Sequence, residues 1–146
     1  MLKAARLSAV RFVQDTLLLF DPAIGIGVSY VDWDDHADMK GLANTDLIGL
    51  AGFGITEHTS GTYEVSFAVT IATYNDGYLL RAIDYADTFY SRMVVGQEFE
   101  IFNPADGLHL GWAKFTPGTT CNPVNRAEVR SAQTIVASAV IIAVES

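Results

Sequence analysis

The sequence predicts a single α+β domain, in which a mainly antiparallel β-sheet carries two amphipathic helices packed on one face. Residues 62–72 alternate between large apolar side chains at odd positions and small or polar ones at even positions, as in a half-buried strand. After Asn75-Asp76-Gly77 the apolar residues recur every three or four positions, which is typical of an amphipathic helix. The length of 146 residues favours one domain, residues 1–146, around one hydrophobic core.

The first predicted element is a helix over residues 2–20, because its apolar residues fall on one side. Arg11, Gln14 and Asp15 interrupt the apolar stretch that a secretory signal requires, so we expect no export. Asp21-Pro22 should end the helix, since proline lacks a backbone donor and disfavours helical angles in the preceding residue.

Residues 24–31 are predicted to form a strand with Ile24, Ile26, Val28 and Tyr30 on one face. Its two glycines indicate a bulge or a close neighbour. A dinucleotide-binding loop is disfavoured, because the third glycine and the following helix start of that motif are missing.

The densest charge cluster opens a predicted long loop over residues 32–46. Its members Asp32, Asp34, Asp35, His36 and Asp38 are candidate ligands for a divalent cation, which carboxylates and imidazole can hold. The spacing departs from that of a helix-loop-helix calcium loop, which needs a central glycine and a terminal glutamate. We therefore favour a solvated or partner-facing acidic surface and predict no metal or other cofactor. The candidate interface residues in this segment are Trp33, Asp34, Asp35 and Lys40.

Two hairpins are predicted on either side of the central helix, which should span residues 78–95 and end before Gly96. In the first, residues 47–57 turn back into the central strand, and their imperfect alternation indicates a bulge. In the second, residues 98–102 and 108–115 flank a turn-forming pentad. His109 is expected to be a satisfied or surface histidine and not a general base. The buried stripe of the helix should comprise Leu79, Ala82, Ile83, Ala86, Phe89, Tyr90 and Met93.

Residues 116–130 contain prolines, glycine and asparagines that predict a long irregular loop. Cys121 lies there without a local base, which favours a structural thiol over a nucleophile, and no catalytic residue is predicted elsewhere. Arg126 and Arg130 are either an ordinary solvated pair or partners for carboxylates of a neighbouring chain, so they are interface candidates. Residues 131–145 form the last predicted strand, whose two apolar faces indicate an interior strand or one covered by another subunit.

The composition narrows the classes of function. Nine basic and seventeen acidic residues give a net charge of -8, which argues against binding nucleic acid through its phosphates. The single cysteine excludes an internal disulfide, so a reducing cytoplasm is the default compartment. Hydrophobic residues make up 50% of the chain, yet no apolar run is long enough to span a membrane. This apolarity indicates either surfaces buried against other subunits or a core rich in Ala and Val.

The order of these elements resembles that of the tail terminator, or tail completion, proteins of long-tailed bacteriophages. The resemblance lies in the opening helix, the apolar strand 24–31, the long alternating strand, the helix 78–95 and the strand running to the C-terminus. It implies a small α+β subunit that assembles as a hexameric ring on the last ring of the tail tube, stops tube polymerisation and presents a surface to the head connector. The hairpin 98–115 and the loop after it are longer than in the family's simplest plan.

This resemblance implies a structural protein of the virion, assembled in the host cytoplasm, with no catalysis and no membrane contact. Its partners would be its own copies, the tail tube protein and the head-tail connector or neck proteins, while DNA passes through the lumen without specific binding. The alternative is a small metal-dependent enzyme or ligand-binding α+β protein that uses the cluster from Asp32 to Asp38.

Overall fold

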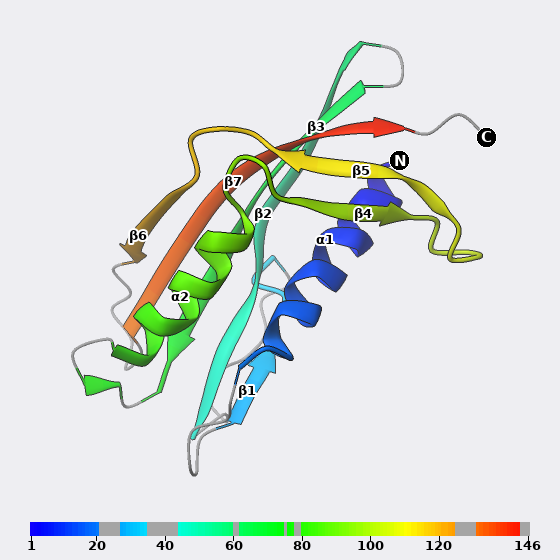
Figure 1. Cartoon of the computed structure of the whole chain (residues 1–146). Coiled ribbons are helices and arrows are strands. Elements are labelled where there is room, and N and C mark those ends of the chain that lie inside the picture. Colours follow the sequence, from blue (N-terminus) through cyan, green and yellow to red (C-terminus); the bar gives the residue numbers. More distant parts are fainter. Residues whose placement is uncertain are drawn as a thin grey trace.

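The computed structural model describes residues 1–20, 27–34, 44–59, 62–74, 76–77, 80–124 and 131–143 (Figure 1). It has the predicted α+β class. The helices are α1 (Leu2–Leu17) and α2 (Leu80–Arg92). The strands are β1 (Gly27–Tyr30), β2 (Thr45–Thr59), β3 (Thr62–Thr73), β4 (Glu98–Phe102), β5 (His109–Phe115), β6 (Thr120–Val124) and β7 (Ser131–Ala143).

The described strands form one sheet in the order β1-β2-β3-β7-β5-β4, with β6 also paired to β7. Only β1 and β2 are parallel among these pairs, so the predicted mainly antiparallel sheet is confirmed. Both predicted hairpins are present, as the pairs β2–β3 and β4–β5. The last strand is an interior one, because β3 pairs along one edge of β7 while β5 and β6 share the other.

Both helices pack on the same face of this curled sheet, as predicted (Figure 1). Helix α1 lies against β4 and β2, and α2 lies against β7 and β3. The odd-numbered residues of β3 and β7 point into the core that the helices cover, which confirms the alternation of the central strand. An aromatic cluster of Phe12, Phe67, Phe99 and Phe115 joins α1 to β3, β4 and β5, with ring centroids 5.3 to 6.2 Å apart. Burying each such ring contributes about 1.5–3 kcal/mol.

The predicted bulge lies in β2. The β2–β3 register shifts between Ala51 and Gly54, and Gly52 between them has a φ of 60°, a conformation that glycine adopts without strain. Gly49 is needed for a different reason, because a Cβ there would lie 1.5 Å from the carbonyl oxygen of Val31. Gly96 also adopts the expected left-handed conformation, with a φ of 95°.

The predicted irregular loop over residues 116–130 is wrong at residues 120–124, which form β6. Pro123 lies opposite Gln133 in that strand. A proline is tolerated there because β6 pairs with β7 alone among the described strands, so one edge needs no donor. Cys121 is therefore a strand residue and not a loop residue. Arg126 and Arg130 lie outside the described residues.

The predicted loop over residues 32–46 ends earlier than expected. Residues Asp32 to Asp34 form a turn after β1, and β2 already begins at Thr45, so Asp46 is a strand residue. Ile24, Ile26, Asp35, His36, Asp38 and Lys40 lie outside the described residues.

Both helices are shorter than predicted, and the buried side of α2 differs from the predicted one. Helix α1 ends at Leu17 and α2 spans Leu80–Arg92. Ile83 and Tyr90 of the predicted stripe are 43% and 41% exposed, whereas Tyr85 is buried. The buried positions Ala82, Tyr85, Ala86, Phe89 and Met93 still follow helical spacing, so the stripe is real but centred on a neighbouring line of residues. Leu79 lies outside the described residues.

Candidate functional site

The described part of the acidic cluster is tied to α1. Arg6 of α1 donates to Asp32 Oδ2 at 2.6 Å and to Asp34 Oδ2 at 3.2 Å. Each of these two carboxylates therefore already has a cationic partner within the chain. Among the described residues, no group of three or more His, Cys, Asp or Glu side chains is placed to hold a metal ion.

Asp34 also organises the bulge of β2. Its Oδ1 accepts the backbone N–H of Gly52 at 2.8 Å, and its Oδ2 accepts that of Phe53 at 3.4 Å. Burial alone would raise the pKa of Asp34, but the hydrogen bonds from Gly52, Arg6 and Phe53 favour the carboxylate and bring this pKa below its usual range. The candidate interface residue Asp34 thus has a structural task in its own chain.

Trp33 covers part of the sheet face that carries no helix. Its backbone N–H bonds to Leu50 O at 3.0 Å, and its indole Nε1 donates to Thr70 O at 3.1 Å. The ring packs beside Val31, Leu47 and Ala72 in a small second core. The half-buried Trp33 therefore packs against its own chain, and its role as an interface residue stays a prediction.

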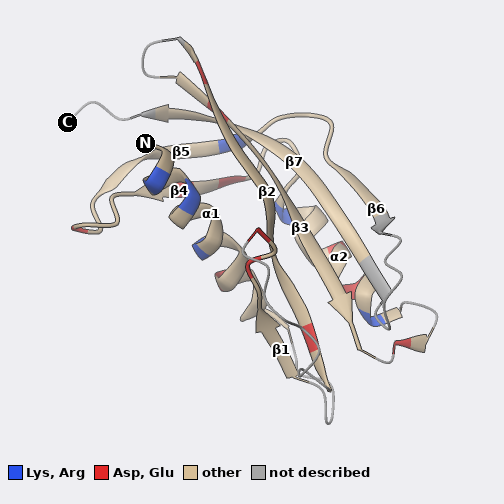
Figure 2. Cartoon of the chain, turned by 180° about the vertical axis from the view of Figure 1, so that it is seen from behind, with Lys and Arg blue, Asp and Glu red and all other residues tan. Residues whose placement is uncertain are grey.

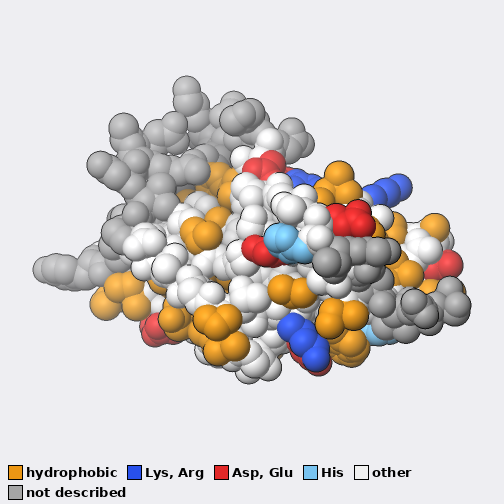
Figure 3. Space-filling view, turned by 90° about the horizontal axis from the view of Figure 1, so that it is seen from above, with side chains coloured by type: hydrophobic (Ala, Val, Ile, Leu, Met, Phe, Trp, Pro, Cys, Tyr) orange, Lys and Arg blue, Asp and Glu red, His pale blue; other side chains and the backbone are white. Residues whose placement is uncertain are grey.

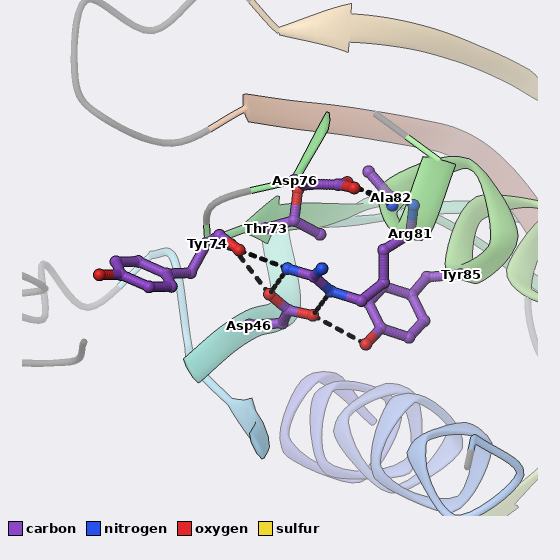
Figure 4. A network of polar contacts seen from close by, with 7 residues as sticks. All are labelled: Asp46, Thr73, Tyr74, Asp76, Arg81, Ala82 and Tyr85. Atoms are coloured by element: carbon purple, nitrogen blue, oxygen red, sulfur yellow. Dashed lines mark hydrogen bonds and ion pairs between the residues drawn. The ribbon is translucent and has the colours of Figure 1, made fainter. Parts of the chain in front are cut away.

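A buried polar network that the sequence did not predict joins β2, β3 and α2 (Figure 4). Asp46, with no exposed surface, accepts from Arg81 Nε at 2.6 Å, from Arg81 NH2 at 3.0 Å and from the hydroxyl of Tyr85 at 2.8 Å. The backbone N–H of Tyr74 donates to the same carboxylate at 2.9 Å, and its carbonyl accepts from Arg81. Burial, together with the hydrogen bond to Asp46, raises the pKa of Tyr85, so this hydroxyl stays protonated.

The start of α2 is held by Asp76 of the same region. Its carboxylate accepts the backbone N–H groups of Arg81 and Ala82 at 3.0 and 2.8 Å and the hydroxyl of Thr73 at 2.9 Å. This satisfies donors that a helix leaves unpaired at its N-terminus. In the sequence, only the position of Asp76 shortly before the apolar stripe of α2 could have indicated this cap.

Two hollows border these elements. One of about 550 Å³ is lined by Phe20, Arg81 and Tyr85, among others, and one of about 250 Å³ lies between α1 and β4 beside Arg11 and Arg92. The polar atoms of Arg81 and Tyr85 are directed to Asp46 and serve the folded structure. Carboxylates line both hollows, Asp76 and Asp84 the larger one and Asp15, Glu98 and Glu100 the smaller one.

The other two candidate groups are at the surface. Cys121 is exposed as a residue, but its thiol is partly buried beside Gln133. This partial burial, followed by the charge of Asp87, raises the pKa of the thiol, which disfavours the reactive thiolate. His109 begins β5 and lies with its Nδ1 3.3 Å from Glu100 Oε1, as expected for a surface histidine.

One face of the sheet carries no helix, and we call it the outer sheet face. Directly paired residues of a sheet share a face. The register therefore places Trp112 beside Ile142, and Lys114 beside Val140. Trp112, Val136 and Ile142 are 42%, 45% and 59% exposed. Figure 2 shows β3 and β7 from behind with no helix in front of them. Figure 3 shows the molecule from above, where apolar side chains reach the surface among acidic, basic and histidine side chains.

The outer sheet face carries apolar side chains at Trp112, Val140 and Ile142 and small ones along β3, at Ser66 and Ala68. Charged residues lie among them. Glu64 of β3 lies opposite Val140 and pairs with His58 at 2.7 Å, while Lys114 lies opposite both Val140 and Glu98, and Glu100 lies opposite Trp112. Such a surface is suited to contact with another protein.

No protein-family model matches this chain. No curated protein matches it either. Comparison with solved structures does find similar chains, one of which aligns over 99% of this chain and 96% of its own length with a TM-score of 0.53. The two sequences are 13% identical, so this likeness shows the fold alone. Neither described helix is long and apolar enough to cross a membrane.

Proposed function

We propose that this chain is a structural subunit of a bacteriophage neck that assembles as a hexameric ring on the end of the tail tube. The ring ends tube polymerisation and joins the tail to the head connector. The order of the elements, which resembles that of tail terminator proteins, supports this proposal. The observation that carries it is the outer sheet face, because a sheet with helices on one side only has a face left for other subunits.

The exposed apolar residues fit this role in kind and in position. Trp112 and Ile142 lie side by side on β5 and β7 as one apolar patch, and Val136 is exposed further along the same face of β7, whereas scattered apolar residues would need no explanation. Fixed strands hold this patch in a defined shape, so a partner can bind it without ordering a loop first. A ring contact of this kind needs shape and apolar area and no reactive group.

The charges support the same role. A net charge of -8 suits a channel through which DNA passes without binding to the wall. The carboxylates Asp32, Asp34 and Asp46 all have partners within the chain, where these pairs hold the fold together.

The test is the assembly state of the purified chain, alone and with the tail tube protein of the same phage. Size-exclusion chromatography with light scattering should give a ring of about six chains, in solution or on tube ends. Electron microscopy should show that adding the chain during polymerisation gives shorter, capped tubes. Tube protein from an unrelated tail is the control and should be unaffected. A chain that stays monomeric and leaves tube length unchanged would contradict the proposal.

A further inference from the structure

The edge strand β4 has main-chain groups that its own sheet does not use. The hydrogen bond from Phe115 N to Gln97 O, at 3.0 Å, shows that the odd-numbered residues of this segment turn their main-chain groups towards β5. The residues between them turn theirs the other way, as in any antiparallel pair. Glu98 and Glu100 therefore direct both N–H and C=O away from β5, and no described residue bonds to these groups.

Helix α1 closes this free edge at one end and leaves the rest open. Ser8 Oγ of α1 accepts the N–H of Phe102 at 3.1 Å, which confirms that this N–H points away from β5. Beside Glu98 and Glu100, the space between α1 and β4 is the hollow of about 250 Å³. Unpaired main-chain groups beside an open groove are the site at which an extended peptide can add a strand to a sheet.

Two other edges of the sheet are less suited to such pairing. The hydrogen bond from Thr116 N to Ser138 O shows that the even-numbered residues of β7 face the edge that β5 and β6 share. The residues of β6 that face outwards are therefore Cys121 and Pro123, and the proline has no N–H to offer. The free part of β2 begins at its bulge, where the carboxylate of Asp34 already accepts two N–H groups.

A cationic group without an acceptor lines the same hollow. The guanidinium of Arg92 lies over the ring of Phe12, 5.4 Å from its centroid, and its buried Nε has no hydrogen-bond partner among the described residues. The carboxylates of the hollow are placed elsewhere, since Asp15 pairs with Arg11 at 3.8 Å and the two glutamates of β4 belong to the outer sheet face. Buried polar groups normally have a partner, so Arg92 lacks an acceptor that a bound segment can supply.

We propose that the free edge of β4 binds an extended segment of another protein as an added strand, with an acidic side chain of that segment at Arg92. The main chain of the segment exchanges hydrogen bonds with Glu98 and Glu100, which supplies affinity for any extended peptide. Successive side chains of the added strand point to opposite faces of the sheet. Those on the helix side meet Arg92, where an Asp or Glu forms a charge-assisted hydrogen bond and so selects the partner.

A second copy of β4 is a poor occupant of this edge. Two β4 strands paired antiparallel through their free edges would place glutamates of the two copies opposite one another. Like charges directly opposite destabilise a pair of strands. The occupant is therefore a different strand, and this site goes beyond the ring contact proposed above, which uses the outer sheet face.

The experiment selects peptides of about twelve residues from a displayed random library on the full chain and maps where the tightest one binds. Amide hydrogen exchange of the unaltered chain, with and without saturating peptide, locates the site without any substitution. The amides of Glu98 and Glu100 should exchange at least about tenfold more slowly in the complex. Those of Phe99 and Ile101, which already face β5, should change little.

Three variants test the contacts by calorimetric titration with the same peptide, and circular dichroism with thermal melting checks that each is folded. Glu100→Pro removes an outward N–H without removing a bond to β5, and it should weaken binding at least about tenfold. Arg92→Met removes the cation, keeps an apolar side chain over Phe12 and should weaken binding by about the same factor. Cys121→Pro is the matched control, because it removes an outward N–H from the edge of β6, and it should bind the peptide like the unaltered chain.

A library that yields no binder would overturn the inference, as would a peptide that protects other amides or whose affinity Glu100→Pro or Arg92→Met leaves unchanged. Protection of Glu98 and Glu100 in the chain alone, as its concentration rises, would also overturn it, because another copy would then occupy the edge. Ring formation is measured separately by light scattering, so either proposal can fail while the other stands.

Discussion

At the scale of single residues, the chain uses charge to fix the ends of its strands. Asp46 at the start of β2 and Asp34 after β1 each collect several donors from segments distant in the sequence. A buried carboxylate is costly unless it is paired and hydrogen-bonded, and Asp46 meets both conditions. The buried Asp46–Arg81 pair therefore indicates which packing the chain specifies more than it indicates a gain in net stability.

Removal of the Asp46 carboxylate should destabilise the fold strongly. Asp46→Ala leaves Arg81, Tyr85 and the N–H of Tyr74 without their acceptor, and losing one member of a buried pair costs about 3–5 kcal/mol. Tyr85→Phe removes one hydroxyl and should cost about 1 kcal/mol. Urea denaturation measures both, with Asp84→Ala on the exposed side of α2 as a near-neutral control. An Asp46→Ala midpoint equal to that of the control would show that the network contributes nothing.

The contribution of Asp34 should depend on pH. Its pKa is lowered in the folded chain, so its stabilisation is fully present above the unfolded pKa of about 3.9 and is lost as the pH falls through the folded value. Asp34→Ala should therefore cost about 1 kcal/mol at pH 7, a modest value because the side chain is 36% exposed, and less below about pH 4. Denaturation curves across pH 2 to 7 check this. A difference that stays constant over that range would refute the assignment.

At the scale of elements, the sheet is organised by where backbone segments come closest. The turn after β1 runs beside β2, with hydrogen bonds from Val31 N to Ile48 O and from Trp33 N to Leu50 O, both at 3.0 Å. Gly49 lies between those two acceptors, and only a missing side chain lets Val31 approach so closely. The bulge at Gly52 follows directly and is capped by Asp34.

Two glycine substitutions in β2 should therefore differ sharply. A Cβ at position 49 would lie 1.5 Å from the Val31 carbonyl oxygen, a backbone atom that cannot turn aside, so Gly49→Ala should cost about 3 kcal/mol or more. A Cβ at position 54 would meet only Ser66 Oγ, at 3.7 Å, so Gly54→Ala should stay within about 0.5 kcal/mol of the unaltered chain. Thermal melting of both proteins decides the matter, and equal melting temperatures would count against the close approach.

At the scale of the whole molecule, the two faces of the sheet differ in how much of their own chain covers them. The inner face carries both helices and the aromatic cluster. The outer face carries Trp33 at one end and the exposed Trp112 near the other. Trp33 therefore probes the part of this face that its own chain covers, and Trp112 probes the exposed part.

Quenching of tryptophan fluorescence by acrylamide should distinguish Trp33 from Trp112. In Trp33→Phe only Trp112 fluoresces, and its quenching should fall about twofold or more as protein concentration drives assembly, because the ring covers a side chain that is 42% exposed in one copy. In Trp112→Phe only Trp33 fluoresces, and its quenching should not change. Equal behaviour of the two proteins would show that the outer sheet face is not the assembled surface.

The sequence alone was sufficient to predict the α+β class, the two hairpins, the helix positions, the bulge and the one-sided packing of the helices. These follow from periodicity and turn chemistry, which act between near neighbours. The sequence also indicated a last strand that is either interior or covered by another subunit, since it is apolar on both faces, and the structure shows it paired along both edges. The ring, its partners and the virion setting stay predictions.

Tertiary structure alone decided the rest. Strand β6 forms around a proline because β7 offers it an edge, and Tyr85 is buried in place of Ile83 because Asp46 accepts its hydroxyl. Asp46 and Arg81 are 35 residues apart, and no local pattern shows that they meet. The same holds for the outer sheet face, whose patch comes from β5 and β7 side by side. Local periodicity shows which residues are buried within an element, but only the pairing of distant segments shows which side of the sheet is left uncovered.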